Sequence, residues 1–270
     1  MGAKAFQKKY GPWVLITGAS SGIGEAMAFE AARRRLNVVL VARSEVRLAD
    51  ISVQLKQTYG VETRVIVADL ARPDAVDAVT GQTAELDIGL LANCAGYGTS
   101  GDFVDIPAED ELDMINVNCR ASAALTHVFS KRFIERGKGG IILMSSIVAF
   151  QGVARSANYA ATKAWAQVFA EGLRLELGPR GIDVLAVAPG PVNSGFAARA
   201  GMQMGGAARP VTVACGAFAS LGRTGLVRPG ALAKLLGYSL AMLPRFARRR
   251  IMSAIMKGMT RHRNGDASKA

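Results

Sequence analysis

Cysteine and histidine are scarce in this chain of 270 residues, which contains three cysteines and two histidines. Cys94, Cys119 and Cys215 show no C-x-x-C spacing and are odd in number, so we expect no disulfide framework and a reducing, cytoplasmic location. His127 and His262 stand far apart, and neither has a cysteine or carboxylate at ligand spacing. We therefore expect no metal site.

Long apolar runs are also absent, and none approaches the roughly 18 residues that a membrane-spanning helix needs. The first residues argue against a signal peptide, and Phe6 stands where a myristoylated N-terminus has serine or threonine. Apolar residues nonetheless make up 50% of the chain. The sequence can therefore bury a sizeable core, in one large domain or two small ones.

Acidic residues are outnumbered, with 21 against 33 basic residues and a formal net charge of +12. Most of the excess lies in residues 244–270, where Asp266 is the one acidic residue. This segment indicates an anionic surface as partner, or simply solvated charge. Nucleic acid is not expected, because no aromatic residues are interleaved with the cations and no nucleic-acid-binding motif is present.

The same segment has the pattern of an amphipathic helix. Its apolar face comprises Ile251, Met252, Ile255, Met256 and Met259. Arg250, Lys257 and Arg261 fall on the opposite side. Such a helix could bind peripherally at a membrane surface, or its apolar face could pack on the domain or on a second subunit.

Apolar runs alternate with helical patterns up to residue 190. The expected strands are Trp13–Thr17, Val38–Ala42, Arg64–Ala68, Ile88–Asn93, Gly140–Ser145 and Asp183–Ala188. The expected helices are Ile23–Arg35, Leu48–Tyr59, Asp74–Leu86, Glu109–Arg136 and Ser156–Leu177. Continuous apolar strands are typical of a sheet that is buried on both faces. The predicted fold is therefore α/β, a single doubly wound parallel sheet of Rossmann type with helices on both faces.

A glycine-rich turn follows the first strand and opens the first helix. Its residues include Gly18, Ser20, Ser21, Gly22, Ile23 and Gly24. Gly18 permits a tight turn, Gly22 lets a pyrophosphate approach the backbone, and the helix N-terminus offers free N–H groups to phosphates. The turn also contains the Gly-x-Ser-x-Gly of a hydrolase nucleophile elbow, but no histidine lies where a catalytic triad needs one. The turn therefore predicts a dinucleotide site.

The end of the second strand indicates which dinucleotide binds. Enzymes that use NAD carry an acidic residue about 20 positions after the glycines, which bonds the ribose 2′-hydroxyl. Ala42 occupies that place, and Arg43 follows it. An arginine can bind a 2′-phosphate with its fork of N–H donors, so NADP(H) is favoured.

Tyr159 and Lys163 stand four residues apart and therefore share one face of their expected helix, with Ser146 upstream at the end of a strand. A free tyrosine has a pKa near 10. A nearby lysine cation, together with an oxidised nicotinamide, favours the phenolate and lowers that pKa. Ser146 can bond the substrate oxygen. The cluster predicts acid/base chemistry on a carbonyl or alcohol.

With these motifs, residues 12–195 resemble the short-chain dehydrogenase/reductase family. The matching residues are Thr17–Gly24, Asp69 with Leu70, Asn93-Cys94-Ala95-Gly96, Asn118, Ser146, Tyr159 with Lys163, and Pro189-Gly190. The resemblance implies that Tyr159 is the general acid in reduction and the base in oxidation. It implies that Lys163 lowers the tyrosine pKa and binds the nicotinamide ribose, and that Asn118 holds a water linked to the lysine.

The resemblance also assigns the remaining cofactor contacts. Asp69 and Leu70 would touch the adenine, Asn93, Ala95 and Gly96 would line the cofactor, and Pro189, Gly190, Val192 and Ser194 would frame the carboxamide. The family pattern further implies a homodimer or homotetramer. The chain departs from the pattern at Cys94, which replaces asparagine, and before the second strand, where the usual helix-ending glycine is missing and Asn37 is expected to supply a left-handed cap.

Beyond residue 190 the pattern changes. Residues 193–210 predict an irregular loop, either over the active site or merely on the surface. A helix at Thr212–Leu221, a short strand at Leu226–Arg228 and a variable C-terminal helical extension follow. The expected organisation is a dinucleotide-binding catalytic domain at residues 1–243, with a substrate loop at about 193–230, and a basic amphipathic tail at 244–270.

The ending resembles a branch of the family that includes long-chain 3-oxoacyl reductases. The expected function is therefore the NADP(H)-dependent interconversion of a carbonyl and an alcohol on an apolar substrate, such as a 3-oxoacyl chain. The alternative is a non-catalytic dinucleotide sensor or scaffold on the same fold. That alternative predicts the loss of Ser146, Tyr159 or Lys163, and all three are present.

Overall fold

Seven parallel strands form one central sheet in the computed structural model, which describes residues 2–203 and 205–260. The strands are β1 (Trp13–Thr17), β2 (Asn37–Ala42), β3 (Thr63–Val67), β4 (Ile88–Asn93), β5 (Gly139–Met144), β6 (Ile182–Val187) and β7 (Leu226–Val227). Their order is β3-β2-β1-β4-β5-β6-β7, and each neighbouring pair is parallel. The chain reverses its direction across the sheet between β1 and β4, and ligands bind at such a switch point.

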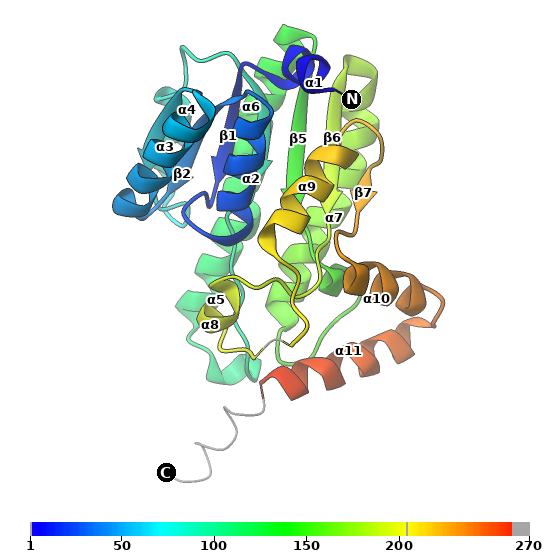
Figure 1. Cartoon of the computed structure of the whole chain (residues 1–270). Helices are drawn as coiled ribbons and strands as arrows, with labels where there is room; N and C mark the ends of the chain where they lie inside the picture. Colours follow the sequence, from blue (N-terminus) through cyan, green and yellow to red (C-terminus); the bar gives the residue numbers. More distant parts are fainter. Residues whose placement is uncertain (1, 204, 261–270) are drawn as a thin grey trace.

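Helices cover both faces of the sheet (Figure 1). On one face lie α1 (Ala3–Tyr10), α2 (Gly22–Arg33), α3 (Glu45–Tyr59) and α9 (Pro210–Ser220). On the other lie α4 (Ala75–Gly81), α6 (Ser122–Arg136) and α7 (Ala157–Leu177). The two faces alternate along each strand: Val14 and Ile16 join the first core, and Leu15 joins the second. The predicted doubly wound fold is confirmed.

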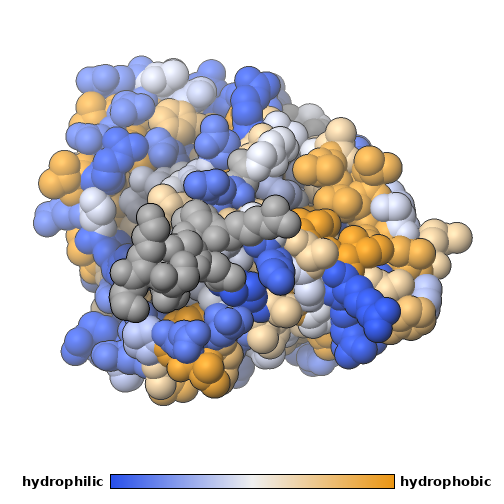
Figure 2. All heavy atoms as spheres, turned by 90° about the horizontal axis from the view of Figure 1, so that it is seen from below, coloured by the Kyte–Doolittle hydropathy of each residue, from blue (hydrophilic) through white to orange (hydrophobic). Residues whose placement is uncertain are grey.

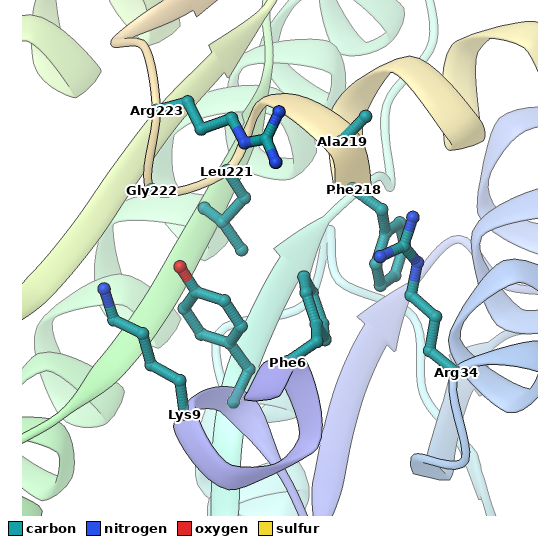
Figure 3. Close-up of a pocket in the computed structure, with 9 residues that line it drawn as sticks. Phe6, Lys9, Arg34, Phe218, Ala219, Leu221, Gly222 and Arg223 are labelled. Atoms are coloured by element: carbon teal, nitrogen blue, oxygen red, sulfur yellow. The ribbon is translucent and has the colours of Figure 1, made fainter. Parts of the chain in front are cut away.

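The N-terminal helix α1 is an element that the sequence pattern did not reveal. Its two apolar anchors, Phe6 and Tyr10, lie four residues apart and are buried against α9, where the Phe6 and Phe218 rings are 5.5 Å apart. The Tyr10 hydroxyl donates to Asp183 at 2.6 Å. Figure 3 shows the cavity between α1 and α9, at the amino ends of the strands. Eight residues with one apolar pair give too little periodicity to predict a helix.

The turn between α2 and β2 corrects the expectation for Asn37. The left-handed residue is Arg35, with φ of 64°, and Asn37 already belongs to β2. The amide of Arg35 donates to the Ala32 carbonyl and the amide of Leu36 to the Ala31 carbonyl, which is a Schellman ending. Because Leu36 must enter the core immediately after the helix, the reversal comes two residues earlier than Asn37.

The long helix expected at Glu109–Arg136 is divided in three. A π-helical turn, η2 (Asn116–Ala121), joins α5 (Ala108–Ile115) to α6. Such wide turns are rare and often occur at functional sites. This one carries Asn118 into the interior. The helix expected at Asp74–Leu86 is also shorter, since α4 ends at Gly81.

Three helices of the C-terminal part lie over the carboxyl ends of the strands (Figure 1). The expected loop at 193–210 contains a helical turn, α8 (Phe196–Arg199), and is followed later by α10 (Ala231–Ala241) and α11 (Arg245–Met259). Met252 and Met256 are buried in a third cluster together with Tyr159. The apolar face of the C-terminal helix thus packs on the domain, which is one of the two interpretations of its sequence. The expected tail residues 261–270 lie outside the described part of the chain.

Candidate active site

The glycine-rich turn shapes one end of a cleft of about 400 Å³ at the carboxyl ends of β1 and β4. Gly18 and Gly22 have φ of +67° and +58°, values that favour glycine. A Cβ on Gly24 would lie 2.1 Å from the Gly18 carbonyl oxygen, so only glycine lets α2 approach the turn this closely. Ser21 precedes α2 without a side-chain cap, and the first N–H groups of the helix face the cleft.

Two arginines also line the cleft. Arg43 is exposed beside Ala42, and both residues line the cleft. Arg199, which the sequence did not reveal, reaches over the cleft from α8, with its Cζ atom 3.6 Å from the centre of the Tyr97 ring. Partial burial and then the positive charge of Arg43 lower the pKa of Arg199. Within residues 2–203 and 205–260, neither arginine forms an ion pair with a carboxylate.

This cleft fits a nicotinamide dinucleotide. The glycine backbone and the N-terminus of α2 would hold the pyrophosphate. Arg43 would bind the 2′-phosphate, since Ala42 cannot bond a 2′-hydroxyl. Asp69 accepts from the amide of Ala71 at 3.1 Å, which fixes its carboxylate at the rim of the cleft.

The acid/base cluster lies beside the cleft. Ser146 follows β5 and caps the short helix η3 (Ile147–Phe150) by accepting from the amide of Val148 at 3.4 Å. Tyr159 and Lys163 project from one face of α7, and the Lys163 Nζ lies 5.8 Å from the centre of the Tyr159 ring. The Ser146 hydroxyl lies near enough to Tyr159 to lower the pKa of the phenol. The structure thus brings together the three residues that the sequence singled out.

Burial sets the protonation of this cluster. Burial raises the pKa of Tyr159 to about 12, and the nearby Ser146 hydroxyl offsets part of this rise. Burial also lowers the pKa of Lys163 to about 8. The sequence predicted a lowered tyrosine pKa with lysine and an oxidised nicotinamide acting together. The side chains alone give the opposite direction, because desolvation of the phenolate outweighs the lowering of the pKa by Ser146.

The side chains of Lys163 and Asn118 both lie next to Gly96. Lys163 donates to the Met144 carbonyl at 3.0 Å. Asn118 accepts from the Tyr97 amide at 3.1 Å and donates to the Tyr97 carbonyl at 2.9 Å and to Thr162 at 3.0 Å. A Cβ on Gly96 would lie 2.9 Å from the Asn118 Oδ1 and 3.2 Å from the Lys163 Nζ. The glycine therefore lets the two polar side chains lie under the cofactor loop.

A second, apolar pocket of about 140 Å³ opens on the other side of Tyr159. Ser146 and Tyr159 are its polar residues near β5 and α7, and Pro189, Gly190 and Val192 form one wall. Its far side is rich in methionine: Met202, Met252, Met256 and Met259. Ile23, Ser194 and Phe196 line both this pocket and the cofactor cleft, so the two spaces meet at these three residues.

Most of the expected cofactor residues line one space or the other. The cleft is lined by Gly18, Ser20, Ser21, Gly22, Ile23, Gly24, Arg43, Asp69, Leu70, Ala95, Gly96 and Ser194. Asn93 differs: its side chain is buried and donates to Thr126 on α6 at 3.0 Å, so it holds β4 against that helix.

Thr17 and Phe196 are two further residues that the sequence analysis did not assign. The Thr17 hydroxyl accepts from the amides of Cys94 and Ala95, both at 3.0 Å, and so ties together the ends of β1 and β4. The Phe196 ring lies 5.3 Å from that of Tyr159. Thr17 stands inside the recognised glycine motif, whereas nothing in the pattern around Phe196 indicates its contact.

A family model described as short chain dehydrogenase matches residues 12–204. The chain belongs to the short-chain dehydrogenase family. Members of this family are oxidoreductases that bind nicotinamide dinucleotides.

Relatives with known names differ in activity. A very-long-chain 3-oxoacyl-CoA reductase of Anas platyrhynchos is 36% identical, over 70% of this chain and 62% of that protein. An inactive hydroxysteroid dehydrogenase-like protein 1 of Rattus norvegicus is 34% identical, over 71% of this chain and 59% of that protein. The match therefore spans about three fifths of the length of each relative.

Solved structures extend the similarity to almost the whole chain. A 7beta-hydroxysteroid dehydrogenase superposes with a TM-score of 0.85 at 29% identity, and the match covers 92% of this chain and 98% of that one. A short-chain dehydrogenase from Sphingobium yanoikuyae in complex with NADPH superposes with a TM-score of 0.79 at 35% identity, over 90% and 95% of the two chains.

Proposed function

We propose that this protein is an NADPH-dependent reductase of apolar ketones, with 3-oxoacyl chains as the preferred class. One observation carries the proposal: Tyr159 and Ser146 line an apolar pocket that shares Ile23, Ser194 and Phe196 with the dinucleotide cleft, and this cleft has Arg43 in place of a carboxylate at the end of β2. The 3-oxoacyl-CoA reductase relative and the NADPH-bound neighbour support it.

The bound cofactor would supply the hydride. Ser146 would donate to the substrate oxygen, and Tyr159 would give that oxygen its proton. With the phenol pKa raised to about 12 by burial, Tyr159 is protonated at neutral pH, the state that reduction requires. Lys163 is mostly cationic at pH 7, since its pKa is about 8, and its charge would stabilise the phenolate left after proton transfer.

The direct test is NADPH oxidation with ketones and 3-oxoacyl thioesters of increasing chain length. Tyr159→Phe removes the proton donor and keeps the ring, so kcat should fall by about 10²–10⁴. Tyr238→Phe is the matched control, because Tyr238 is exposed on α10 and should leave kcat unchanged. Wild-type turnover in Tyr159→Phe would refute the assignment.

The non-catalytic alternative is supported by the relative that is named inactive. It predicts tight NADPH binding without turnover of any tested carbonyl. Binding measured by NADPH fluorescence, beside the turnover screen, separates the two functions. A chain that binds NADPH with micromolar affinity but turns over no substrate in the series would be a sensor or scaffold.

We also propose a homodimer or homotetramer. The observation in support is the exposed apolar surface of α7, where Val168 and Leu175 are open to solvent. Light scattering coupled to size exclusion tests this assembly, and a monomer at micromolar concentration would contradict it.

A further inference from the structure

Large apolar side chains are exposed on α10, on the turn after it and in the first turn of α11. The exposed fractions are 66% for Leu235, 66% for Tyr238, 86% for Met242 and 57% for Phe246. We call these four residues the α10–α11 face. Figure 2 shows apolar atoms gathered on the side of the molecule where Figure 1 places these two helices. A contiguous apolar patch of this kind marks an interaction surface.

The charge around the α10–α11 face has a single sign. Residues 231–260 contain six basic residues and no acidic residue. These are Lys234, Arg245, Arg248, Arg249, Arg250 and Lys257. In the described part of the chain, none of them forms an ion pair with a carboxylate. Apolar side chains rimmed by such cations match the chemistry of an anionic lipid surface.

The inner sides of the same helices form the substrate pocket. Leu236 of α10 lines it together with Met252 and Met256 of α11. Ile255 also lines the pocket and keeps 39% of its surface exposed, so it stands at the border between the pocket and solvent. The two helices therefore contribute one wall of the pocket on their inner side and exposed apolar residues on their outer side.

We infer that the α10–α11 face docks on anionic membranes, with the two helices that line the apolar pocket from within lying at the lipid surface. A second copy of the chain fits this face less well, because an isologous contact would bring two sets of six uncompensated cations together. The docking is peripheral: none of the described helices is long and apolar enough to cross a bilayer. The lipid-facing residues differ from the sequence expectation, since Met252 and Met256 are turned inward.

Docking of this face does not depend on the proposed reductase function, and only the delivery of an acyl substrate rests on that function. The test is sedimentation of the full-length chain with phosphatidylcholine vesicles, with and without about one third phosphatidylserine. Wild type should pellet with the anionic vesicles, less with the neutral ones and less at high salt. Wild type that stays in the supernatant with anionic vesicles at low salt would overturn the inference.

Two double variants locate the contact. Arg249→Gln with Arg250→Gln should weaken partitioning about fivefold per charge, or roughly 25-fold. Met242→Glu with Phe246→Glu should weaken it at least about tenfold on both vesicle types. All variants should reduce a short soluble ketone at the wild-type rate. Loss of pelleting with unchanged activity would therefore support the docking, whereas absence of turnover in wild type would contradict only the proposed reductase function.

Matched controls lie elsewhere on the surface. Arg180→Gln removes an exposed cation at the amino end of β6, and Val46→Glu charges an exposed apolar residue of α3. Both should pellet like wild type. If Arg180→Gln lost as much vesicle binding per removed charge as the Arg249→Gln and Arg250→Gln pair, net charge alone would explain the binding. That result would overturn the assigned face. The assigned face would also be wrong if Met242→Glu with Phe246→Glu changed the oligomeric state but not the vesicle binding.

Discussion

Replacing Lys163 by methionine should stabilise the fold at neutral pH while it abolishes catalysis. The Lys163 side chain is buried, and burial lowers its pKa from 10.5 to about 8. At about 1.36 kcal/mol per pH unit, this corresponds to a destabilisation of roughly 3 kcal/mol for holding the cation in the interior. Methionine keeps the apolar stem but loses the hydrogen bond to the Met144 carbonyl, at a cost of about 1 kcal/mol. The expected net gain is about 2 kcal/mol.

The lowered lysine pKa also predicts how the stability difference between Lys163→Met and wild type changes with pH. Because the lysine pKa is lowered in the folded state, the destabilisation is fully present below about pH 8 and disappears as the pH rises from there towards 10.5. The advantage of Lys163→Met should therefore be largest at pH 7 and vanish by about pH 10. At pH 7 it should raise Tm by several degrees, about 2–4 °C per kcal/mol for a chain of this size.

Denaturant unfolding of the cofactor-free protein from pH 7 to pH 10 measures the effect. Lys131→Met, an exposed position on α6, is the matched control and should show no such dependence on pH. A Lys163→Met variant that is less stable than wild type at pH 7, or a difference that is constant across this range, would refute the reasoning. Saturating NADPH should stabilise wild type more than the variant, because the lysine is expected to bind the nicotinamide ribose.

Three further predictions concern arginines. Arg43→Asp should weaken NADPH binding by about 1.5–3 kcal/mol, measured by fluorescence titration; equal affinity of wild type for NADH and NADPH would contradict the role. Arg199→Gln should raise the NADPH Kd by roughly tenfold, the effect of one charged hydrogen bond, and an unchanged Kd would show that Arg199 only packs on its neighbouring ring. Arg35→Gly should raise the free energy of unfolding by about 1 kcal/mol by relieving a left-handed residue, although it also removes an exposed side-chain hydrogen bond of 3.4 Å to the Tyr59 carbonyl. Arg155→Gly, at the same φ of 64°, should lower it, because the Arg155 side chain bonds Thr260 at 2.9 Å; equal changes in both would refute the backbone argument.

The sheet could be predicted from the sequence because its strands are continuous apolar runs between polar turns. The bounds of β1 and β4 agree with the prediction, and those of β2 begin one residue earlier. The glycine turn and the Ser146, Tyr159 and Lys163 cluster were equally readable, because chemistry restricts their spacing. Two such constraints can be read from the local sequence: a glycine where a Cβ would lie 2.1 Å from a carbonyl oxygen, and a lysine one helical turn from its tyrosine.

Contacts between distant segments have no such signature in the local sequence. Arg199 reaches Tyr97 across 102 positions of the chain, and its α8 turn lies in a segment of glycine, alanine and methionine without a clear period. The raised pKa of Tyr159 was not predictable either, since it comes from burial by residues that fold over it, among them Phe196. Local patterns specify which groups react, whereas tertiary packing sets how strongly they are desolvated.

The C-terminal helix shows why an amphipathic pattern predicts burial but not the partner. Its apolar stripe was compatible with a membrane and with the domain, and the structure uses its inner residues, Met252 and Met256, to close the substrate pocket. A chain shortened to Leu243 would therefore lose one wall of the pocket along with any lipid contact. Loss of vesicle binding and loss of activity would then have the same cause. Point substitutions on the outer surface, at Met242 and Phe246, separate the two because these side chains face away from the pocket and are already exposed.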